Sequence, residues 1–502
     1  MNNTHSHKLK IKDLGIDTYR ENIIFIRADS HVCKSEGFTA LTRIVVHKSG
    51  NEIIATLNVV HSDLLKEGEA SLSEEAMKSL GVQNGESISL SHLQPIESLG
   101  KVRAKIYKQE LDEQAFKEII KDVVAGHYSN IEIAAFVTAC AGNNLSVNEI
   151  TSLTKAMIAV GNKMHWKNKM ILDKHCVGGL PGNRTTPIVV SIVAAAGLTI
   201  PKTSSRAITS PAGTADTMET MTPVNLTIEE IQKVVEKEGG CFAWGGAVKL
   251  SPADDLLIAV EKALDVDSEG QMVASVLSKK AAAGSTHIVI DIPVGPTAKV
   301  RSQEEALRLQ YYFKAVSEVI GFHTEIIITD GTQPVGRGLG PSLEAMDVLA
   351  VLKNKPDAPT DLKERAITIS AALFKMSGKY VLGTEASVAR TILENGEAYK
   401  KFKAICEAQG GFKEPTFAKY KHEVFTEKEG VVKSVDNRKL ARIAKLAGAP
   451  ESPSAGVLYY SPLGKKISKG DLLFSIYAES QGELEYAKEY LNSLNELIVI
   501  EK

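Results

Sequence analysis

The sequence predicts an α/β protein with a helical lobe and a small β-rich domain at each end. Its 502 residues are enough for about three domains at roughly 100–200 residues each. Hydrophobic residues make up 43 % and charged residues 24 %, which is typical of a globular chain with buried cores. Helical and strand periodicities alternate through the middle of the chain, which favours a largely parallel sheet covered by helices.

The first part of the chain predicts two domains. Residues 1–97 are expected to form a β-barrel-like domain, because short runs rich in β-branched residues, such as 40–46 and 52–60, alternate with turns. Apolar residues then recur at helical spacing, which predicts a helical domain over residues 98–170. We expect a second piece of this domain near residues 252–285.

The rest of the chain predicts two more domains. An α/β domain that binds phosphate is expected over residues 171–415, interrupted by residues 252–285. Its buried strands include 287–291 and 324–329, which alternate with helical segments. Strand and turn patterns return near the end of the chain and predict a C-terminal α+β domain over residues 416–502.

Charge and cysteine content exclude several classes. Fifty-nine basic and sixty-one acidic side chains leave a formal charge of −2, so no global field attracts nucleic acid or an anionic membrane. Five widely separated cysteines without a C-x-x-C pair predict neither a disulfide framework nor a metal site. The N-terminal residues lack a secretory signal, and no apolar run reaches the roughly 18 residues of a membrane span. We therefore expect a cytoplasmic protein.

A glycine-rich stretch over residues 173–187, DKHCVGGLPGNRTTP, carries the strongest chemical signal. Its three glycines would let the backbone approach a ligand closely, and the helix opened near Thr186 would offer unsatisfied N–H groups to an anion. Lys174 adds a positive charge. The stretch is not a Walker A loop, because no Gly-Lys-Ser/Thr follows. These residues alone leave phosphate binding and a plain strand-to-helix turn both open.

A second loop, residues 201–216, gathers serine and threonine hydroxyls around Arg206, and such donors suit phosphate oxygens. Between residues 173 and 216, four cations outnumber two aspartates in a chain that is slightly acidic overall. A polar surface loop would also explain this composition. Two loops suited to anions flank one helix, and this arrangement favours a phosphate site.

Two further segments are candidates for ligand contact. In residues 265–280, the side chains of Gln271, Ser275 and Lys279 share one face of a predicted helix, which a solvated surface would also explain. Residues 329–344 follow a buried strand and are rich in glycine without the spacing of a dinucleotide-binding loop. We expect this loop on the ligand side of the sheet.

Three segments resemble the signature sequences of the thymidine and pyrimidine nucleoside phosphorylase family. They are DKHCVGG at 173–179, SSRAITSPAGTAD at 204–216 and ASVLSKK at 274–280. GLPGN at 179–183 and QPVGRGLGP at 333–341 resemble the longer branch, which includes archaeal AMP phosphorylase and bacterial type 2 thymidine phosphorylases. The resemblance covers nearly the whole chain. It implies a nucleoside phosphorylase type II fold with a β-barrel-like N-terminal domain and a C-terminal α+β domain. It also implies a homodimer formed through the helical domain, or a higher homo-oligomer.

The resemblance also implies the reaction. In this family inorganic phosphate attacks the anomeric carbon of a nucleoside, the base leaves, and an α-pentose 1-phosphate forms without a cofactor or metal. The expected conversion is thymidine and phosphate to thymine and 2-deoxy-α-D-ribose 1-phosphate, a step of pyrimidine metabolism and nucleotide salvage. One alternative is phosphorolysis of a nucleoside 5′-monophosphate such as AMP to ribose 1,5-bisphosphate. Another is a phosphoribosyltransferase, which would bind magnesium through paired carboxylates such as Asp254 and Asp255.

The motifs assign roles to individual residues by the same resemblance. The implied catalytic residues are His175 and Asp267. His175 would lie at the glycosidic bond, and Asp267 matches the position of the proton donor in the AMP-cleaving branch. The implied phosphate-binding residues are Lys174, Gly179, Thr186, Ser204, Ser205, Arg206 and Thr214. The implied nucleoside-binding residues are Ser275, Lys279 and Lys299.

Two positions depart from the pattern. Val260 stands where pyrimidine-specific relatives place an arginine that reads the base, and Cys176 replaces the serine that usually follows the motif histidine. Loss of the arginine removes a planar donor suited to a pyrimidine carbonyl. The residues therefore leave the base open, and also leave open whether the substrate is a nucleoside or its 5′-monophosphate.

Overall fold

A computed structural model describes residues 8–18, 21–207, 210–248, 250–266 and 268–502. The chain divides into two compact units, one built from Met1–Tyr107 and Lys121–Ala135, and the other from Lys108–Ile120 and Phe136–Lys502. Among the described residues, no helix has both the length and the apolar character needed to cross a membrane.

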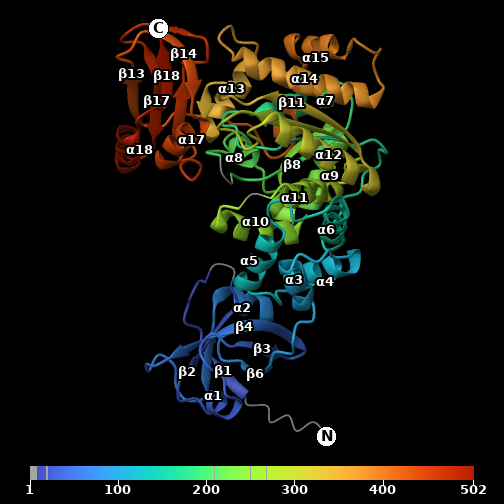
Figure 1. Cartoon of the computed structure of the whole chain (residues 1–502), viewed down its shortest axis with the longest axis vertical. Coiled ribbons are helices and arrows are strands. Elements are labelled where there is room, and N and C mark those ends of the chain that lie inside the picture. The colour runs from blue at the N-terminus through green and yellow to red at the C-terminus, as the bar shows by residue number, and fades with distance from the viewer. Residues whose placement is uncertain (1–7, 19–20, 208–209, 249, 267) are drawn as a thin grey trace. The chain divides into compact units, whose positions relative to one another are not determined.

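The first unit contains a closed six-stranded barrel in the order β1-β5-β2-β4-β3-β6, which confirms the predicted barrel (Figure 1). Its strands are β1 (Lys8–Ile11), β2 (Ile23–Arg27), β3 (Arg43–Lys48), β4 (Asn51–Val60), β5 (Glu69–Leu72) and β6 (Ser87–His92), with helices α1 (His31–Glu36) and α2 (Glu74–Leu80). Alternate strand residues, such as Ile24, Ile44 and Leu57, fill the barrel core.

Helices follow the barrel. They are α3 (Leu99–Ile106), α4 (Glu113–Val124), α5 (Asn130–Ala139) and α6 (Val147–Ala159). Helix α6 begins at a capping box: the Ser146 hydroxyl accepts from the Glu149 N–H, and the Glu149 carboxylate accepts from the Ser146 N–H. Two later helices, α10 (Pro252–Leu264) and α11 (Glu269–Ala282), pack against α6. Segments distant in sequence therefore form one helical layer in the second unit.

The α/β part of the second unit is built on parallel strands. Strands β7 (Leu172–Cys176), β10 (His287–Val294) and β11 (His323–Asp330) form a sheet in the order β11-β10-β7. Strands β8 (Ile200–Ser204) and β9 (Gly240–Trp244) form a second parallel pair, and the Leu172 N–H donates to the carbonyl of Thr199 just before β8. Because the strands in each sheet are parallel, their carboxyl ends share one edge.

Helices cover these strands with apolar faces. They are α7 (Thr185–Ala195), α8 (Thr214–Glu219), α9 (Ile228–Glu238), α12 (Gln303–Ile320), α13 (Pro341–Leu352), α14 (Thr360–Ser377), α15 (Glu385–Glu394) and α16 (Glu397–Ala408). Helix α7 is apolar on all sides and lies in the centre of the core, in contact with α13, α14 and α16. The helix that the sequence predicts to begin near Thr186 is confirmed, and it is buried.

The C-terminal domain contains strands and two helices. They are β13 (Tyr420–Phe425), β14 (Gly430–Val435), α17 (Asn437–Leu446), β15 (Gly456–Tyr459), β16 (Lys466–Ile467), β17 (Leu472–Ala478), α18 (Gln481–Ser493) and β18 (Ile498–Glu501). A short strand of the α/β part, β12 (Gly338–Leu339), pairs with β15 and so joins the sheet β12-β15-β17-β13. In Figure 1 these elements, in red, lie beside α13. Strand pairing therefore connects the two domains.

Candidate active site

The candidate site lies at the carboxyl edge of the parallel strands, where ligands bind in open α/β sheets. The glycine-rich loop follows β7 and contacts the loops that follow β10 and β11. A Cβ atom built on Gly179 would lie 2.6 Å from Lys299 Cβ, and one built on Gly182 would collide with the Val335 carbonyl oxygen. Both glycines also have positive φ angles, of 75° and 76°. Close approach of the three loops therefore requires glycine at these two positions.

Lys174 lies beneath this loop and is only 2 % exposed. Its Nζ atom donates to Thr185 Oγ1 at 2.7 Å, in the first turn of α7. Burial lowers the pKa of Lys174. An anion at the start of α7 would stabilise the charged ammonium and would also meet the positive end of the helix dipole.

His175 lies among lysine side chains. Burial lowers the pKa of His175 well below its usual value, and nearby ammonium groups lower it further: Lys280, Lys202, Lys279 and Lys174. The imidazole is therefore neutral at pH 7 in the ligand-free protein. A bound anion would reduce the positive potential and raise the pKa of His175, which couples anion binding to protonation of this ring.

Asp173 organises two of these lysines from a fully buried position. Its Oδ2 atom lies 2.9 Å from Lys280 Nζ and its Oδ1 atom lies 3.5 Å from Lys202 Nζ, and Ser285 Oγ donates to Oδ2 at 3.0 Å. Burial alone would raise the pKa of Asp173, but the two lysines outweigh burial and the pKa is lowered. The ionised carboxylate thus connects β7 with β8 and α11.

Ser204 Oγ, at the end of β8, and Asn183 Oδ1, in the glycine-rich loop, are buried and have no hydrogen-bond partner among the described residues. Such atoms are rare in folded proteins, and a bound ligand is one explanation. Thr186 is buried in the first turn of α7, where Arg184 at the N-cap provides no capping hydrogen bond from its side chain. Hydroxyl and backbone donors for an anion therefore gather near Lys174.

The other side chains predicted to bind phosphate follow Ser204 in the chain, and each lies in a different environment. Ser205 is exposed, and Thr214 Oγ1 accepts a hydrogen bond of 2.7 Å from Arg184. Arg206 donates to Asp216 at 3.1 Å and to both carboxylate oxygens of Glu219, at 2.6 and 2.9 Å. These hydrogen bonds raise the pKa of Arg206. The Arg206 guanidinium therefore holds the loop together through these two carboxylates.

The predicted nucleoside residues lie on two elements. On α11, Ser275 Oγ accepts from Lys279 Nζ at 3.3 Å, and the same ammonium lies 2.5 Å from Asp254 Oδ2. The Asp254 carboxylate is thus already paired with a cation. Lys299 lies in the turn after β10, against Gly179. Asp267 falls outside the described residues.

Two buried networks were not anticipated from the sequence. Asp291, in β10, accepts from Asn183 Nδ2 at 3.2 Å and from Thr329 Oγ1 at 2.5 Å, so it ties the glycine-rich loop to the sheet. Glu344 is fully buried and accepts from Arg184 Nε at 2.7 Å. An aspartate inside a predicted buried strand was the available signal for Asp291. Nothing in the sequence marked Glu344 as the partner of Arg184.

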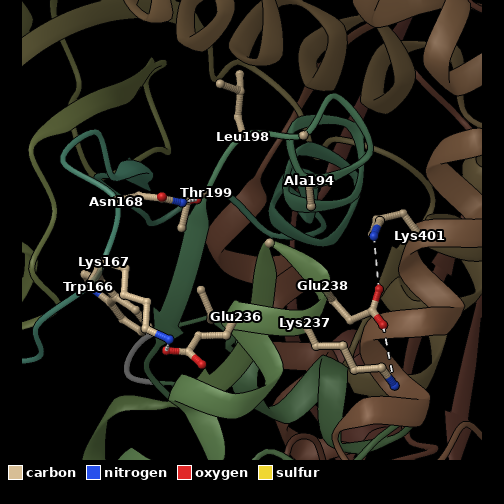
Figure 2. A pocket seen from close by; sticks show the side chains of 13 residues that line it. Trp166, Lys167, Asn168, Ala194, Leu198, Thr199, Glu236, Lys237, Glu238 and Lys401 are labelled. Atoms are coloured by element: carbon tan, nitrogen blue, oxygen red, sulfur yellow. Dashed lines mark hydrogen bonds and ion pairs between the residues drawn. The ribbon is translucent and has the colours of Figure 1, made fainter.

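A separate pocket of about 460 Å³ lies at the other end of β8 and β9 (Figure 2). Figure 2 shows its charged side chains paired with one another. Lys167 lies 2.9 Å from Glu236, and Lys401 lies 3.0 Å from Glu238. Because Thr199 precedes β8, this pocket is at the amino end of the strands. It is therefore not part of the candidate site.

Replacing Gly179 with alanine tests the close approach of the loops. We expect a loss of about 1–3 kcal/mol in the free energy of unfolding, because the new methyl group would collide with Lys299. Gly321→Ala is the matched control, since Gly321 also has a positive φ, of 83°, but nothing lies within 4 Å of an added Cβ. Urea unfolding of both variants measures the difference. Equal destabilisation of the two would contradict a steric role for Gly179.

Comparisons with known proteins agree with this architecture. The chain matches the helical bundle domain of a glycosyl transferase family over residues 99–161 and the α/β domain of that family over residues 168–399. It also matches the pyrimidine nucleoside phosphorylase C-terminal domain over residues 431–498. Fold and matches together define a glycosyltransferase enzyme with a helical lobe, an α/β lobe and a C-terminal domain.

Relatives match along the whole chain. A Legionella pneumophila (strain Corby) protein named "Putative thymidine phosphorylase" is 55 % identical over 500 residues, which cover 100 % of this chain and 97 % of that protein. A Hahella chejuensis protein of the same name is 53 % identical and covers 98 % of both chains. The chain belongs to the thymidine and pyrimidine nucleoside phosphorylase family, as the motifs predicted.

One solved structure shows the fold in a more distant protein. The crystal structure of anthranilate phosphoribosyltransferase from Thermus thermophilus aligns with a TM-score of 0.50 and 20 % identity. The alignment covers 61 % of this chain and 98 % of that one. At this identity the similarity shows a shared fold alone.

Proposed function

We propose that the protein cleaves thymidine with inorganic phosphate, giving thymine and 2-deoxy-α-D-ribose 1-phosphate. The observation that carries the proposal is the buried ammonium of Lys174 against the first turn of α7, with the Ser204 hydroxyl, which has no partner among the described residues, at the end of the neighbouring strand β8. Such a site suits a small, highly charged anion. The names of the relatives support thymidine as the nucleoside. Phosphate is a substrate, and the proposed reaction needs no cofactor.

In the proposed complex, phosphate lies at the amino end of α7. Lys174 and the hydroxyls of Ser204, Thr186 and Thr214 bind its oxygens, and Gly179 allows close approach of the backbone. Ser205, at the exposed edge of the loop, completes this set. Arg206 acts by holding the loop through Asp216 and Glu219 rather than by touching the anion.

The nucleoside lies on the side of α11 and the turn after β10, where Ser275, Lys279 and Lys299 contact the sugar or the base. A phosphate oxygen forms a bond to the anomeric carbon as the bond to the base nitrogen breaks, and the electron pair of that bond leaves with the base. His175, whose pKa rises when phosphate binds, supplies a proton or a hydrogen bond to the departing base. Asp267 is the alternative proton donor.

One observation favours a second candidate function. Val260 is a buried valine on α10, where pyrimidine-specific relatives carry an arginine that reads the base. A site without this arginine has lost a donor to a pyrimidine carbonyl. Phosphorolysis of a nucleoside 5′-monophosphate such as AMP is therefore the second candidate.

In either case we propose that the active protein is a homodimer.

A parallel assay tests both candidates. Thymidine, uridine, AMP, CMP and UMP are each incubated with the protein, with and without phosphate and with and without magnesium, and base release is followed by chromatography. We expect thymine release that depends on phosphate and an equal yield of sugar phosphate. Reaction of the monophosphates without reaction of thymidine would establish the second candidate instead. Strict dependence on magnesium would contradict a phosphorylase and favour a phosphoribosyltransferase.

A further inference from the structure

The amino terminus of α17, in the C-terminal domain, meets two loops of the candidate site. Asn437 is the first residue of α17 and is fully buried. Its side-chain Nδ2 atom donates to the carbonyl oxygen of Gly331 at 3.0 Å, and its backbone N–H donates to Thr297 Oγ1 at 3.1 Å. Gly331 follows β11 and Thr297 follows β10. One asparagine therefore joins the loops of two neighbouring strands.

The turn over residues 295–300 lies between Asn437 and the glycine-rich loop of the site. Arg438, next to Asn437, donates to the Ala298 carbonyl at 3.3 Å. Lys299 is the next residue, and its backbone and Cβ lie against Gly179 of the glycine-rich loop. A shift at Asn437 would therefore reach Lys299 through Thr297 and Ala298 of the same turn.

The C-terminal domain also makes hydrogen bonds to the loop that follows β11. The Leu463 N–H donates to Gln333 Oε1 at 2.8 Å, and the Tyr459 N–H donates to the Arg337 carbonyl at 2.8 Å. Pairing of β12 with β15 continues this contact. The C-terminal domain thus supports both loops at the carboxyl edge of β10 and β11.

Helix capping does not explain Asn437. Asp436 is the N-cap of α17, and its Oδ1 atom accepts from the N–H groups of Arg438 and Lys439, both at 2.9 Å. Burying an amide side chain is costly unless it makes hydrogen bonds. The Asn437 Nδ2 group donates to the loop at Gly331, while its Oδ1 atom is buried without a hydrogen-bond partner among the described residues. The side chain therefore serves the loops rather than the helix.

We propose that Asn437 is a positioning residue for the nucleoside side of the active site. It holds the turn after β10 so that Lys299 stays in place to contact the nucleoside. This inference rests on the proposed function, in which Lys299 binds the nucleoside. It also assigns the C-terminal domain a part in forming the substrate site.

Kinetics of Asn437→Ala test the inference with the nucleoside or nucleotide that the parallel assay identifies. We expect the KM for that substrate to rise by about 10- to 100-fold, because small displacements of positioning groups have effects of this size. The KM for phosphate should stay within about twofold, because the side chains of Lys174 and Ser204 lie on β7 and β8 and Lys174 is held by Thr185, so that only the backbone at Gly179 touches the turn that Asn437 holds. Asn495→Ala, which alters an exposed asparagine of the same domain, is the control and should change neither KM.

A double-mutant cycle with Lys299→Ala separates positioning from general damage. If Asn437 acts through Lys299, Asn437→Ala should raise the KM for the nucleoside or nucleotide only slightly when Lys299 is already alanine. Additive effects, or equal increases in both KM values, would overturn the proposal. Should Asn437→Ala fail to fold, Thr297→Val removes the acceptor of the Asn437 N–H from the loop side, and the same rise in one KM is expected.

Hydrogen exchange in the full chain gives a readout that does not depend on activity. Asn437→Ala should speed exchange in peptides covering residues 295–300 and 331–337, while peptides covering residues 171–179 stay protected. Unchanged exchange at the two loops would overturn the proposal even if the enzyme is active. A wild-type protein without phosphorolysis would instead refute the proposed function, and the exchange result would still decide whether Asn437 holds the loops.

Discussion

Replacing His175 with glutamine is expected to lower kcat by about 10²- to 10⁴-fold, the usual contribution of a general acid or base. Glutamine keeps the polarity of the side chain but cannot be protonated. The fold should tolerate the change, because the wild-type imidazole is already neutral among Lys174, Lys202 and Lys280. Steady-state kinetics and thermal unfolding, measured together, distinguish loss of catalysis from loss of structure.

The control is another partly buried histidine. His287 stacks on His323 at the amino end of β10, away from the site, and burial lowers its pKa as well. His287→Gln should keep kcat within about twofold, since His287 lies far from the reacting atoms along the strand. Wild-type turnover in His175→Gln would remove His175 from the mechanism and leave Asp267 as the proton donor.

We also expect the pKa of His175 to depend on bound phosphate. Burial and the surrounding ammonium groups lower the pKa of His175, so its protonation is unfavourable in the free enzyme. A bound phosphate dianion opposes these charges and should raise the pKa toward or above its ordinary value near 6.5. NMR titration of labelled histidine, with and without phosphate, measures this shift, and His175→Gln identifies the resonance. A pKa that falls on phosphate binding would contradict the proposed placement of the anion.

The sequence was sufficient for the fold class because each element carries its own local signal. β-Branched runs mark the barrel, and the alternation of helices and strands marks the parallel sheet. The capping box at Ser146 and Glu149 is local as well, because its two residues are three apart in the chain. The glycine-rich loop was visible because positive φ angles and close contacts require glycine at positions such as Gly179 and Gly182.

The charged networks of the site were not visible, because their partners are far apart in the chain. Asp173 pairs with Lys280 across more than a hundred residues, and Arg184 pairs with Glu344 across 160. Arg206 is a further example. Its place in a hydroxyl-rich loop predicts phosphate binding, and the structure shows that Glu219, thirteen residues later, binds its guanidinium. Composition counts cations but does not reveal which of them a carboxylate has already neutralised.

Lys174→Met is the second change with a large expected effect. Lys174 is buried, its charge is disfavoured by burial, and its Nζ atom donates to the neutral hydroxyl of Thr185. Methionine fills a similar volume without a charge, so the free energy of unfolding should stay constant or increase. The KM for phosphate should rise by about 100-fold or more, since a buried ammonium binding an anion contributes several kcal/mol. Steady-state kinetics with varied phosphate and urea unfolding measure the two quantities.

Lys280→Met provides the contrast that makes this prediction specific. Lys280 is equally buried, but its ammonium lies 2.9 Å from Asp173, whose other lysine is more distant at 3.5 Å. Removing Lys280 leaves a buried carboxylate poorly compensated, so we expect a loss of about 3–5 kcal/mol in the free energy of unfolding. The two lysines thus have different roles. Lys280 stabilises the fold through its ion pair with Asp173, and the ammonium of Lys174 binds the anion. Equal losses of stability in the two variants would show that Lys174 is structural and that phosphate binds elsewhere.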